Sequence, residues 1–133
     1  MASERPRRLS AAHRLKKRRD YLRVQRGGHK SHLRQFLVFV RPQKDPAAAT
    51  RVGITVTKKV CGAVGRNAIK RRVREAFRHR RARFPDGLDV VFVAKGNAAG
   101  ISSAQVGDQM DQLLRTLARP RDARPAGTEG ANG

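Results

Sequence analysis

The segment 66–83 constrains the fold most, because it carries two different stripes of side chains at helical spacing. Its apolar stripe consists of Ile69, Val73, Ala76 and Phe77, and its basic stripe consists of Lys70, Arg71, Arg74, Arg78 and Arg81. The apolar stripe predicts a helix that packs against a core layer. The basic stripe predicts that another side of the same helix stays outside that core.

The positive charge of this helix is almost unbalanced. Glu75 is the only acidic residue between 66 and 83, and the chain of 133 residues has 31 Lys and Arg against 10 Asp and Glu, a net charge of +21. A basic row is usually a solvated helix face, but like charges three and four residues apart destabilise a helix by roughly a few tenths of a kcal/mol per pair. We therefore expect an external polyanion. Most of the basic residues are arginines, whose planar donors match phosphate, so nucleic acid is a better candidate than a membrane surface.

Hydrophobic periodicity and turn residues predict the order helix, strand, strand, helix, strand, helix. These elements cover 17–26, 36–41, 51–57, 66–83, 88–94 and a last helix that Ser102 or Ser103 caps. The run 88–94 is almost continuously apolar, which is typical of a central or parallel strand. Together they predict one α+β domain over 13–118, a sandwich of helices against a mixed sheet. The ends, 1–12 and 119–133, lack an apolar period, and we expect both to be disordered tails.

The two strands before the basic helix present different faces. In 36–41, Phe36, Val38 and Val40 face one side and Leu37 and Phe39 face the other. In 51–57, Val52, Ile54 and Val56 point inward, whereas Gly53, Thr55 and Thr57 lie on the second face. Because these three residues are small or polar, the second face of 51–57 is a candidate for admitting a ligand.

Other residue types argue against several classes of protein. Cys61 is the only cysteine, so no internal disulfide forms, and a reducing compartment, the cytoplasm, is expected. No apolar run approaches the roughly 20 residues of a membrane span, and no secretion signal is expected. The acidic residues have no metal-ligand spacing, and the four histidines lie in basic stretches that we expect to be exposed. We therefore predict no catalytic residue and no metal ligand on the protein.

The region around the basic helix carries a specific motif. It consists of Arg51-Val52-Gly53-Ile54, Val56, Lys58-Lys59, Ala63-Val64, Arg66-Asn67, Lys70-Arg71, Arg74-Glu75 and Phe77. This motif resembles the signature of the protein subunit of bacterial ribonuclease P, and weaker similarity extends over about 13–118. Apart from the resemblance, Gly62, Ala63 and Gly65 predict a loop of small residues that a bulky partner can approach. Asn67 is expected to cap the helix or to contact a base or ribose.

The resemblance implies a ribonucleoprotein endonuclease that removes the 5′ leader from precursor tRNA. It implies that the RNA subunit supplies the active site and binds most of the Mg²⁺, and that the protein is inactive alone. In the family the basic helix and its preceding loop contact ribonuclease P RNA, which implies Lys58, Lys59, Arg66, Asn67, Lys70, Arg71 and Arg74 here. A cleft between the first helix and the sheet binds the single-stranded leader, which implies Lys17, Tyr21 and Phe39. No DNA and no membrane are expected as partners.

The two aromatic residues among the predicted leader contacts suit either stacking or a core. Stacking on unpaired bases tolerates any sequence, as a variable leader requires. Tyr21, with arginines around it, is expected at the surface, whereas Phe39 fits a core position equally well. Gln25, four residues after Tyr21, stands where the family often has an aromatic residue.

The resemblance also implies three helices and a mixed four-stranded sheet, so one short strand escapes the periodicity analysis. It further implies a left-handed crossover between parallel strands through the basic helix, against the usual preference for right-handed connections.

Three other classes of protein remain open from sequence alone. A ribosomal protein or an assembly factor shares the charge and the basic tails, but does not explain the clustered motif. A double-stranded DNA binder would be expected to carry a helix-turn-helix or zinc pattern, which the sequence lacks. An independent metal nuclease needs convergent carboxylates, and the acidic residues are too scattered for that.

Overall fold

The computed structural model describes residues 13–15 and 17–117, and the two expected tails, 1–12 and 119–133, lie outside the described residues. The described chain runs through α1 (Arg18–Gly27), β1 (His29–His32), β2 (Phe36–Pro42), β3 (Arg51–Thr55), α2 (Ala63–Arg80), η3 (Arg81–Arg83), β4 (Leu88–Ala94), η4 (Gly96–Ala98) and α3 (Ser103–Leu117). The strands form one sheet in the order β1-β2-β4-β3. β3 and β4 are parallel, and the other two pairs are antiparallel.

This architecture confirms the predicted α+β fold with three helices and a mixed four-stranded sheet. The apolar run 88–94 is the central strand β4, which lies between β2 and β3 and is parallel to β3. Because β3 and β4 are parallel neighbours that α2 connects, the expected crossover runs through the basic helix.

The strand missing from the periodicity analysis is β1, which has the sequence His29-Lys30-Ser31-His32. Its residues alternate between half-buried and exposed, and none of them is apolar. Pairing with β2 makes it a strand, with His29 opposite Val40 and His32 opposite Leu37. A strand that depends on its partner's backbone leaves little signal in its own side chains.

Two boundaries around the basic helix differ from the prediction. β3 ends at Thr55, and α2 begins at Ala63, where the sequence predicted a loop. The amide of Arg66 donates to the carbonyl of Gly62 at 2.8 Å, so the small residues from 63 onward form the first helical turn. Asn67 therefore lies in the second turn and does not cap the helix, which corrects the capping prediction.

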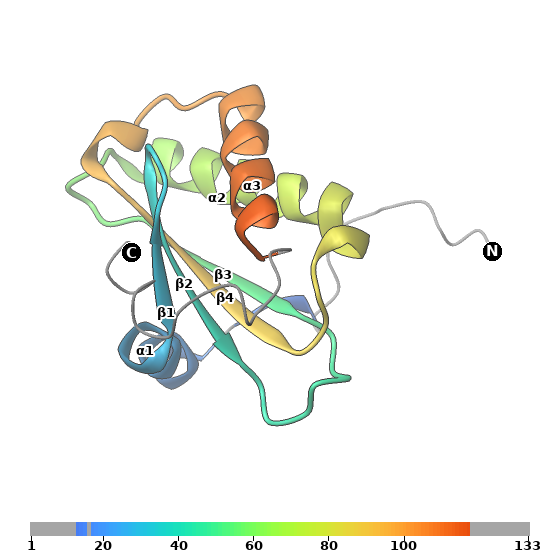
Figure 1. Cartoon of the computed structure of the whole chain (residues 1–133). Coiled ribbons are helices and arrows are strands. Elements are labelled where there is room, and N and C mark those ends of the chain that lie inside the picture. The colour runs from blue at the N-terminus through green and yellow to red at the C-terminus, as the bar shows by residue number, and fades with distance from the viewer. Residues whose placement is uncertain (1–12, 16, 118–133) are drawn as a thin grey trace.

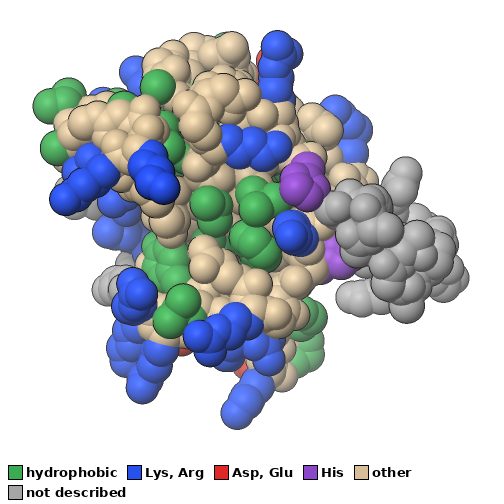
Figure 2. All heavy atoms as spheres, turned by 90° about the vertical axis from the view of Figure 1, so that its left-hand side faces the viewer, with side chains coloured by type: hydrophobic (Ala, Val, Ile, Leu, Met, Phe, Trp, Pro, Cys, Tyr) green, Lys and Arg blue, Asp and Glu red, His purple; other side chains and the backbone are tan. Residues whose placement is uncertain are grey.

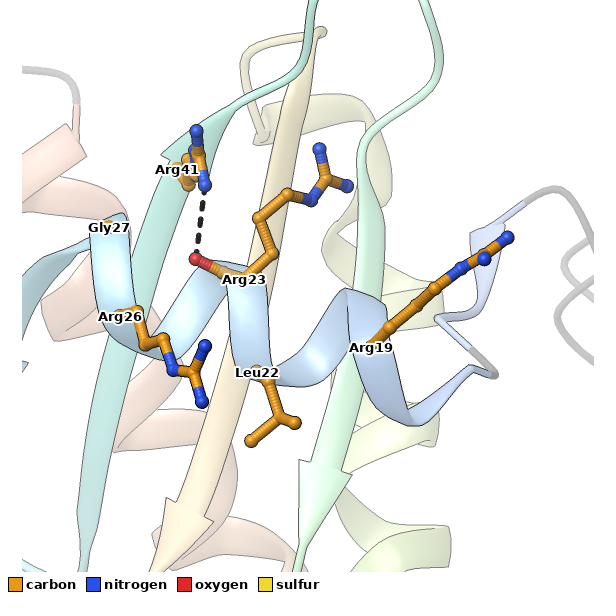
Figure 3. A pocket seen from close by; sticks show the side chains of 6 residues that line it. All are labelled: Arg19, Leu22, Arg23, Arg26, Gly27 and Arg41. Atoms are coloured by element: carbon orange, nitrogen blue, oxygen red, sulfur yellow. Dashed lines mark hydrogen bonds between the residues drawn. The ribbon is translucent and has the colours of Figure 1, made fainter.

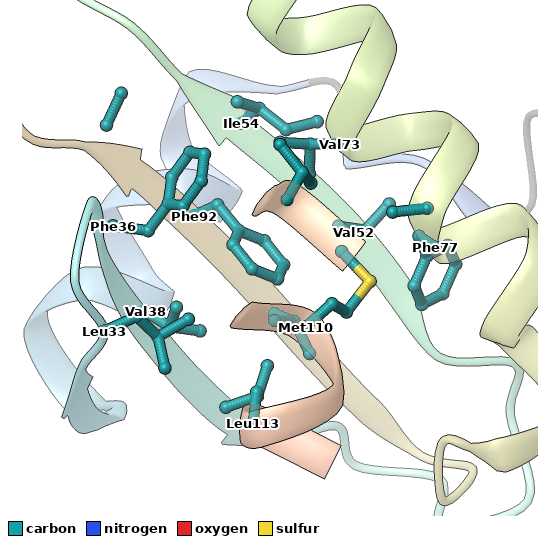
Figure 4. Packing of buried hydrophobic residues seen from close by; sticks show 14 of the residues in the cluster. Leu33, Phe36, Val38, Val52, Ile54, Val73, Phe77, Phe92, Met110 and Leu113 are labelled. Atoms are coloured by element: carbon teal, nitrogen blue, oxygen red, sulfur yellow. The ribbon is translucent and has the colours of Figure 1, made fainter. Parts of the chain in front are cut away.

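The two faces of the sheet are covered unequally. α2 and α3 lie on one face, and α1 lies on the other (Figure 1). The core under α2 and α3 contains Phe36 and Phe92, whose rings meet edge to face with centroids 5.8 Å apart. Val73 and Phe77 of α2 and Met110 and Leu113 of α3 also point into this core (Figure 4). The apolar stripe predicted for the basic helix is thus buried as expected.

The face under α1 holds a smaller cluster, in which Leu15, Val24 and Val91 are buried. At the outer edge of β3, Arg14 pairs with Val52 in a parallel bridge, and the amide of Leu15 donates to the Val52 carbonyl at 2.9 Å. The segment before α1 therefore covers part of the edge of β3 before α1 packs on the sheet.

Candidate nucleic-acid interface

The basic residues predicted from the motif lie on one stretch, from the loop after β3 to the middle of α2. Lys58, Lys59, Asn67 and Arg71 are exposed, and Arg66, Lys70 and Arg74 are half-buried. We call Lys58, Lys59, Arg66, Lys70, Arg71 and Arg74 the α2 cation row. The buried apolar side of α2 anchors Arg66, Lys70, Arg71 and Arg74 of this row on a rigid element.

Ion pairs balance part of the positive charge near the C-terminal end of α2 and in η3. Glu75 contacts Arg78, and Asp111 of α3 contacts Arg80 at 2.7 Å and Arg83 at 3.1 Å. Within the described part of the chain, no ion pair involves the α2 cation row. Arg78 was predicted to belong to the unbalanced stripe, and its pairing with Glu75 corrects that prediction. Among the described residues, the longest series of Lys and Arg side chains without a carboxylate partner therefore lies between 58 and 74, and Arg81 of the predicted stripe also has no ion pair.

Arg66 also fixes the loop before the helix. Its Nη1 donates to the carbonyl of Cys61 at 3.0 Å. A Cβ at Gly65 would lie 2.9 Å from the Sγ of Cys61, so only glycine allows this close approach without a shift. The loop that carries Lys58 and Lys59 is thereby held against the first turn of α2.

Arg74 is the member of the α2 cation row that lies near Arg14 and Tyr21, at the start of the chain's path to α1. Burial lowers the pKa of Arg74, the positive charge of Arg14 lowers it further, and Tyr21 acts in the opposite direction. The guanidinium of Arg74 is thus partly desolvated beside a second cation, at the edge of the sheet where α1 begins. The negative charge of an anion bound at this edge would favour the charged form of Arg74 and so offset both effects.

Tyr21 is half-buried and ties three segments together. Its hydroxyl donates to the carbonyl of Leu15 at 3.3 Å and accepts from the amide of Ile54 at 3.2 Å. A Cβ at Gly53 would lie 2.6 Å from the Cζ of Tyr21. The second face of β3, which the sequence suggested as open to a ligand, is therefore filled by the Tyr21 ring at Gly53.

The predicted leader residues lie near one another. Tyr21 and Phe39 are both half-buried and pack on the cluster of Leu15, Val24 and Val91. Lys17 is exposed at the N-cap of α1, and its carbonyl accepts from the amide of Tyr21 at 3.2 Å.

The surface next to Tyr21 and Phe39 contains residues that the sequence did not indicate. Leu37, Phe39 and Val93 are half-buried and lie on the α1 side of the sheet, and we call them the apolar strip. In the register of β1, exposed Lys30 stands opposite Phe39, and exposed His32 stands opposite Leu37. On this side of the molecule, hydrophobic side chains lie exposed among lysines and arginines (Figure 2). The alternation in 36–41 indicated Leu37, but nothing in the sequence indicated the cationic border from β1.

A buried carboxylate fixes α1 to the sheet. Asp89 of β4 has only 2% of its side chain exposed, and it accepts two hydrogen bonds of 2.8 Å from Arg51 of β3. This contact raises the pKa of Arg51. Arg23 of α1 approaches the same carboxylate at 3.5 Å. Asp89 therefore contacts one arginine from β3 and one from α1.

Metal sites and membrane spans are absent from the described part of the chain. No group of three or more His, Cys, Asp and Glu side chains there is arranged to hold a metal ion. No described helix has both the length and the apolar character needed to cross a bilayer.

The chain matches known proteins over most of its length. Residues 9–118 match the family model described as Ribonuclease P. The ribonuclease P protein component of Gluconacetobacter diazotrophicus is 41% identical over 122 residues, which cover 90% of this chain and 96% of that protein. The corresponding protein of Syntrophus aciditrophicus is 39% identical over 106 residues, covering 80% of this chain and 87% of that protein.

Solved structures agree with these relatives. The RNase P protein of Staphylococcus aureus superposes with a TM-score of 0.72 at 32% identity, covering 80% of this chain and 96% of that one. The RNase P protein of Thermotoga maritima gives a TM-score of 0.70 at 29% identity, covering 80% and 98%. The chain therefore belongs to the ribonuclease P protein family.

Proposed function

We propose that this chain is the protein component of a ribonuclease P ribonucleoprotein, in which it assists a catalytic RNA in removing the 5′ leader from precursor tRNA. The observation that carries the proposal is the α2 cation row, which has no carboxylate partner in the described chain. Family membership supports ribonuclease P RNA as the polyanion that this row binds.

The α2 cation row suits the backbone of a folded RNA. Its charges stand along one rigid helix and its anchored loop, so several phosphates can be contacted without ordering a flexible segment. Asn67 is exposed among these cations, and its amide can donate to a ribose or a base edge.

The apolar strip and its cationic border suit the single-stranded leader. Base stacking on Phe39 and on the ring of Tyr21 contributes about 1–3 kcal/mol per base for any sequence. Lys17 and Lys30 supply positive charge for the leader phosphates at the two ends of this face. Gln25 is half-buried and offers no ring, so stacking falls to Phe39 and Tyr21.

In this proposal the protein positions the substrate and the RNA performs the chemistry. Mg²⁺ is held mainly by RNA phosphates, and the protein alone cleaves nothing. The α2 cation row docks on the RNA subunit while the apolar strip and Tyr21 hold the leader. The scissile phosphate is thereby tethered near the RNA active site, which lowers the entropic cost of reaching it. The ribonucleoprotein works in the cytoplasm, and neither DNA nor a membrane is a partner.

Reconstitution of the protein with ribonuclease P RNA tests the proposal. The affinities for precursor tRNA and for mature tRNA are measured with and without the protein. The protein should strengthen precursor binding by about tenfold or more and leave mature tRNA almost unchanged, because only the precursor offers bases to stack.

Two outcomes would contradict the proposal. If the protein raised the affinity for precursor tRNA and for mature tRNA equally, the proposed leader contact would be wrong. Cleavage of precursor tRNA by the protein and Mg²⁺ alone would move the chemistry from the RNA to the protein.

A further inference from the structure

A second cationic site lies on the side of α1 that faces away from the apolar strip. It is a hollow of about 400 Å³, lined by Arg19, Leu22, Arg23, Arg26, Gly27 and Arg41. Three of its arginines come from α1, and the fourth reaches it from β2 (Figure 3). Neither the α2 cation row nor the proposed leader residues take part in it.

The geometry of α1 separates this hollow from the apolar strip. Tyr21 and Gln25 lie one turn apart on one flank of α1. Arg19, Arg23 and Arg26 are spaced by four and three residues, so they share another side. An RNA strand on the apolar strip would have to cross over α1 to reach Arg26. The hollow is therefore a separate site.

The charge in the hollow is poorly balanced. Arg23 is its only arginine with carboxylates nearby, among the residues that the structure describes, and both contacts, to Asp20 and Asp89, are long at 3.5 Å. Within the same residues, no ion pair involves Arg19, Arg26 or Arg41. Arginines at these spacings repel one another on a helix, so an anion between them would stabilise the arrangement.

The donors in the hollow are partly prearranged. Nη1 of Arg41 donates to the carbonyl of Arg23 at 3.1 Å, which fixes its guanidinium over the end of α1 (Figure 3). A Cβ at Gly27 would lie 3.1 Å from that same Nη1, so the helix end admits the guanidinium closely. Arg41, Arg19 and Arg26 all line the hollow, and each guanidinium is a planar fork of donors that suits phosphate oxygens.

We propose that this hollow binds a phosphate group of an RNA backbone, as a contact separate from both the α2 cation row and the apolar strip. Its size accommodates a phosphate with its neighbouring ribose. The backbone belongs either to the RNA subunit or to a part of the precursor beyond the apolar strip. The chemistry recognised is the same in both cases.

The test uses the full chain and a double substitution, Arg19→Gln with Arg26→Gln. Both side chains are exposed, so their loss leaves the core unchanged. The matched control is Arg34→Gln with Arg115→Gln, which removes the same charge from two exposed arginines elsewhere. Pyrophosphate binding is measured by titration calorimetry. The first variant should bind pyrophosphate about tenfold more weakly, and the control should stay within about twofold of the unsubstituted chain.

Two further measurements distinguish the sources of the phosphate. A comparable loss of affinity for ribonuclease P RNA assigns the backbone to the RNA subunit. A loss confined to precursors with long leaders, measured on the reconstituted ribonucleoprotein, assigns it to the substrate. Unchanged pyrophosphate binding would overturn the site. Weaker pyrophosphate binding with both RNA affinities unchanged would leave only a small-anion site and overturn the RNA contact.

A measurement on the unsubstituted chain does not depend on the variant folding. In an NMR titration with pyrophosphate, the amides of Leu22 and Gly27 should shift, because both residues line the hollow. Shifts restricted to 58–74 would contradict the proposal.

Discussion

Replacing Lys70 and Arg71 by glutamine should weaken binding to ribonuclease P RNA, and the weakening should depend on salt. These two residues test the α2 cation row more cleanly than Arg66 or Arg74. Arg66 also holds the Cys61 carbonyl, and Arg74 is partly desolvated beside Arg14. Neither Lys70 nor Arg71 has an ion-pair partner in the described chain, so the substitution removes charge without leaving an orphaned acid.

The magnitude follows from counter-ion release. Each phosphate contact contributes about 0.7–0.9 to the slope of log affinity against log salt concentration. Losing two contacts therefore lowers the slope by about 1.5. Between about 50 and about 200 mM salt, the difference in affinity between the variant and the unsubstituted protein should shrink by about tenfold.

The assay is filter binding of the protein to labelled ribonuclease P RNA at four or more salt concentrations. The control is Arg34→Gln with Arg115→Gln, which changes the net charge equally at exposed positions outside the row. Parallel binding lines for the Lys70 and Arg71 variant and the unsubstituted protein would refute the reasoning, and so would an equal change of slope in the control.

Three predictions concern the scaffold of the two surfaces. Gly53→Ala should lower the free energy of unfolding by about 1–3 kcal/mol and weaken leader binding, because its Cβ meets the Tyr21 ring; chemical denaturation and precursor binding check this. Asp89→Asn should cost about 2 kcal/mol, less than a fully buried pair because its arginine partners are partly exposed, and denaturation at pH 7 measures it. Asp111→Asn should cost about 0.5–1 kcal/mol at pH 7. Arg80 lowers the pKa of Asp111 in the folded chain, so this ion pair stabilises above the ordinary carboxyl pKa of about 3.9, and its contribution is lost as the pH falls through the lowered value. The unfolding free energies of the Asn variant and the unsubstituted chain should therefore converge in acid, and a constant difference down to about pH 2 would contradict the assignment.

The elements with strong apolar patterns were predictable from sequence. The final helix even has the predicted cap, since Ser102 Oγ accepts from the amide of Gln105, and the Gln105 side chain accepts from the amide of Ser102. β1 was not predictable, because its sequence has no apolar alternation and pairing with β2 decides its conformation.

The candidate sites were predictable only where their charged residues lie close together along the chain. The row between 58 and 74 lies on one segment, and its periodicity places the charges on one side of α2. The pairing of Arg80 could not be predicted from sequence, because its partner Asp111 lies on α3. The four-arginine hollow was also not predictable from sequence, because Arg41 of β2 reaches α1 by donating to the carbonyl of Arg23. The role of Tyr21 as a tie between segments also depends on its contact with distant Gly53.

The short segment before α1 affects how copies of this protein behave toward one another. β3 is an outer strand, and its unpaired amides and carbonyls would otherwise invite a strand from a second molecule. Arg14 and buried Leu15 occupy part of that position through their contacts with Val52. A chain shortened past Leu15 would leave the edge of β3 free to pair with another strand. It would also expose the apolar cluster of Val24 and Val91 that Leu15 covers. We expect such a chain to self-associate into sheet-rich aggregates when no RNA is present.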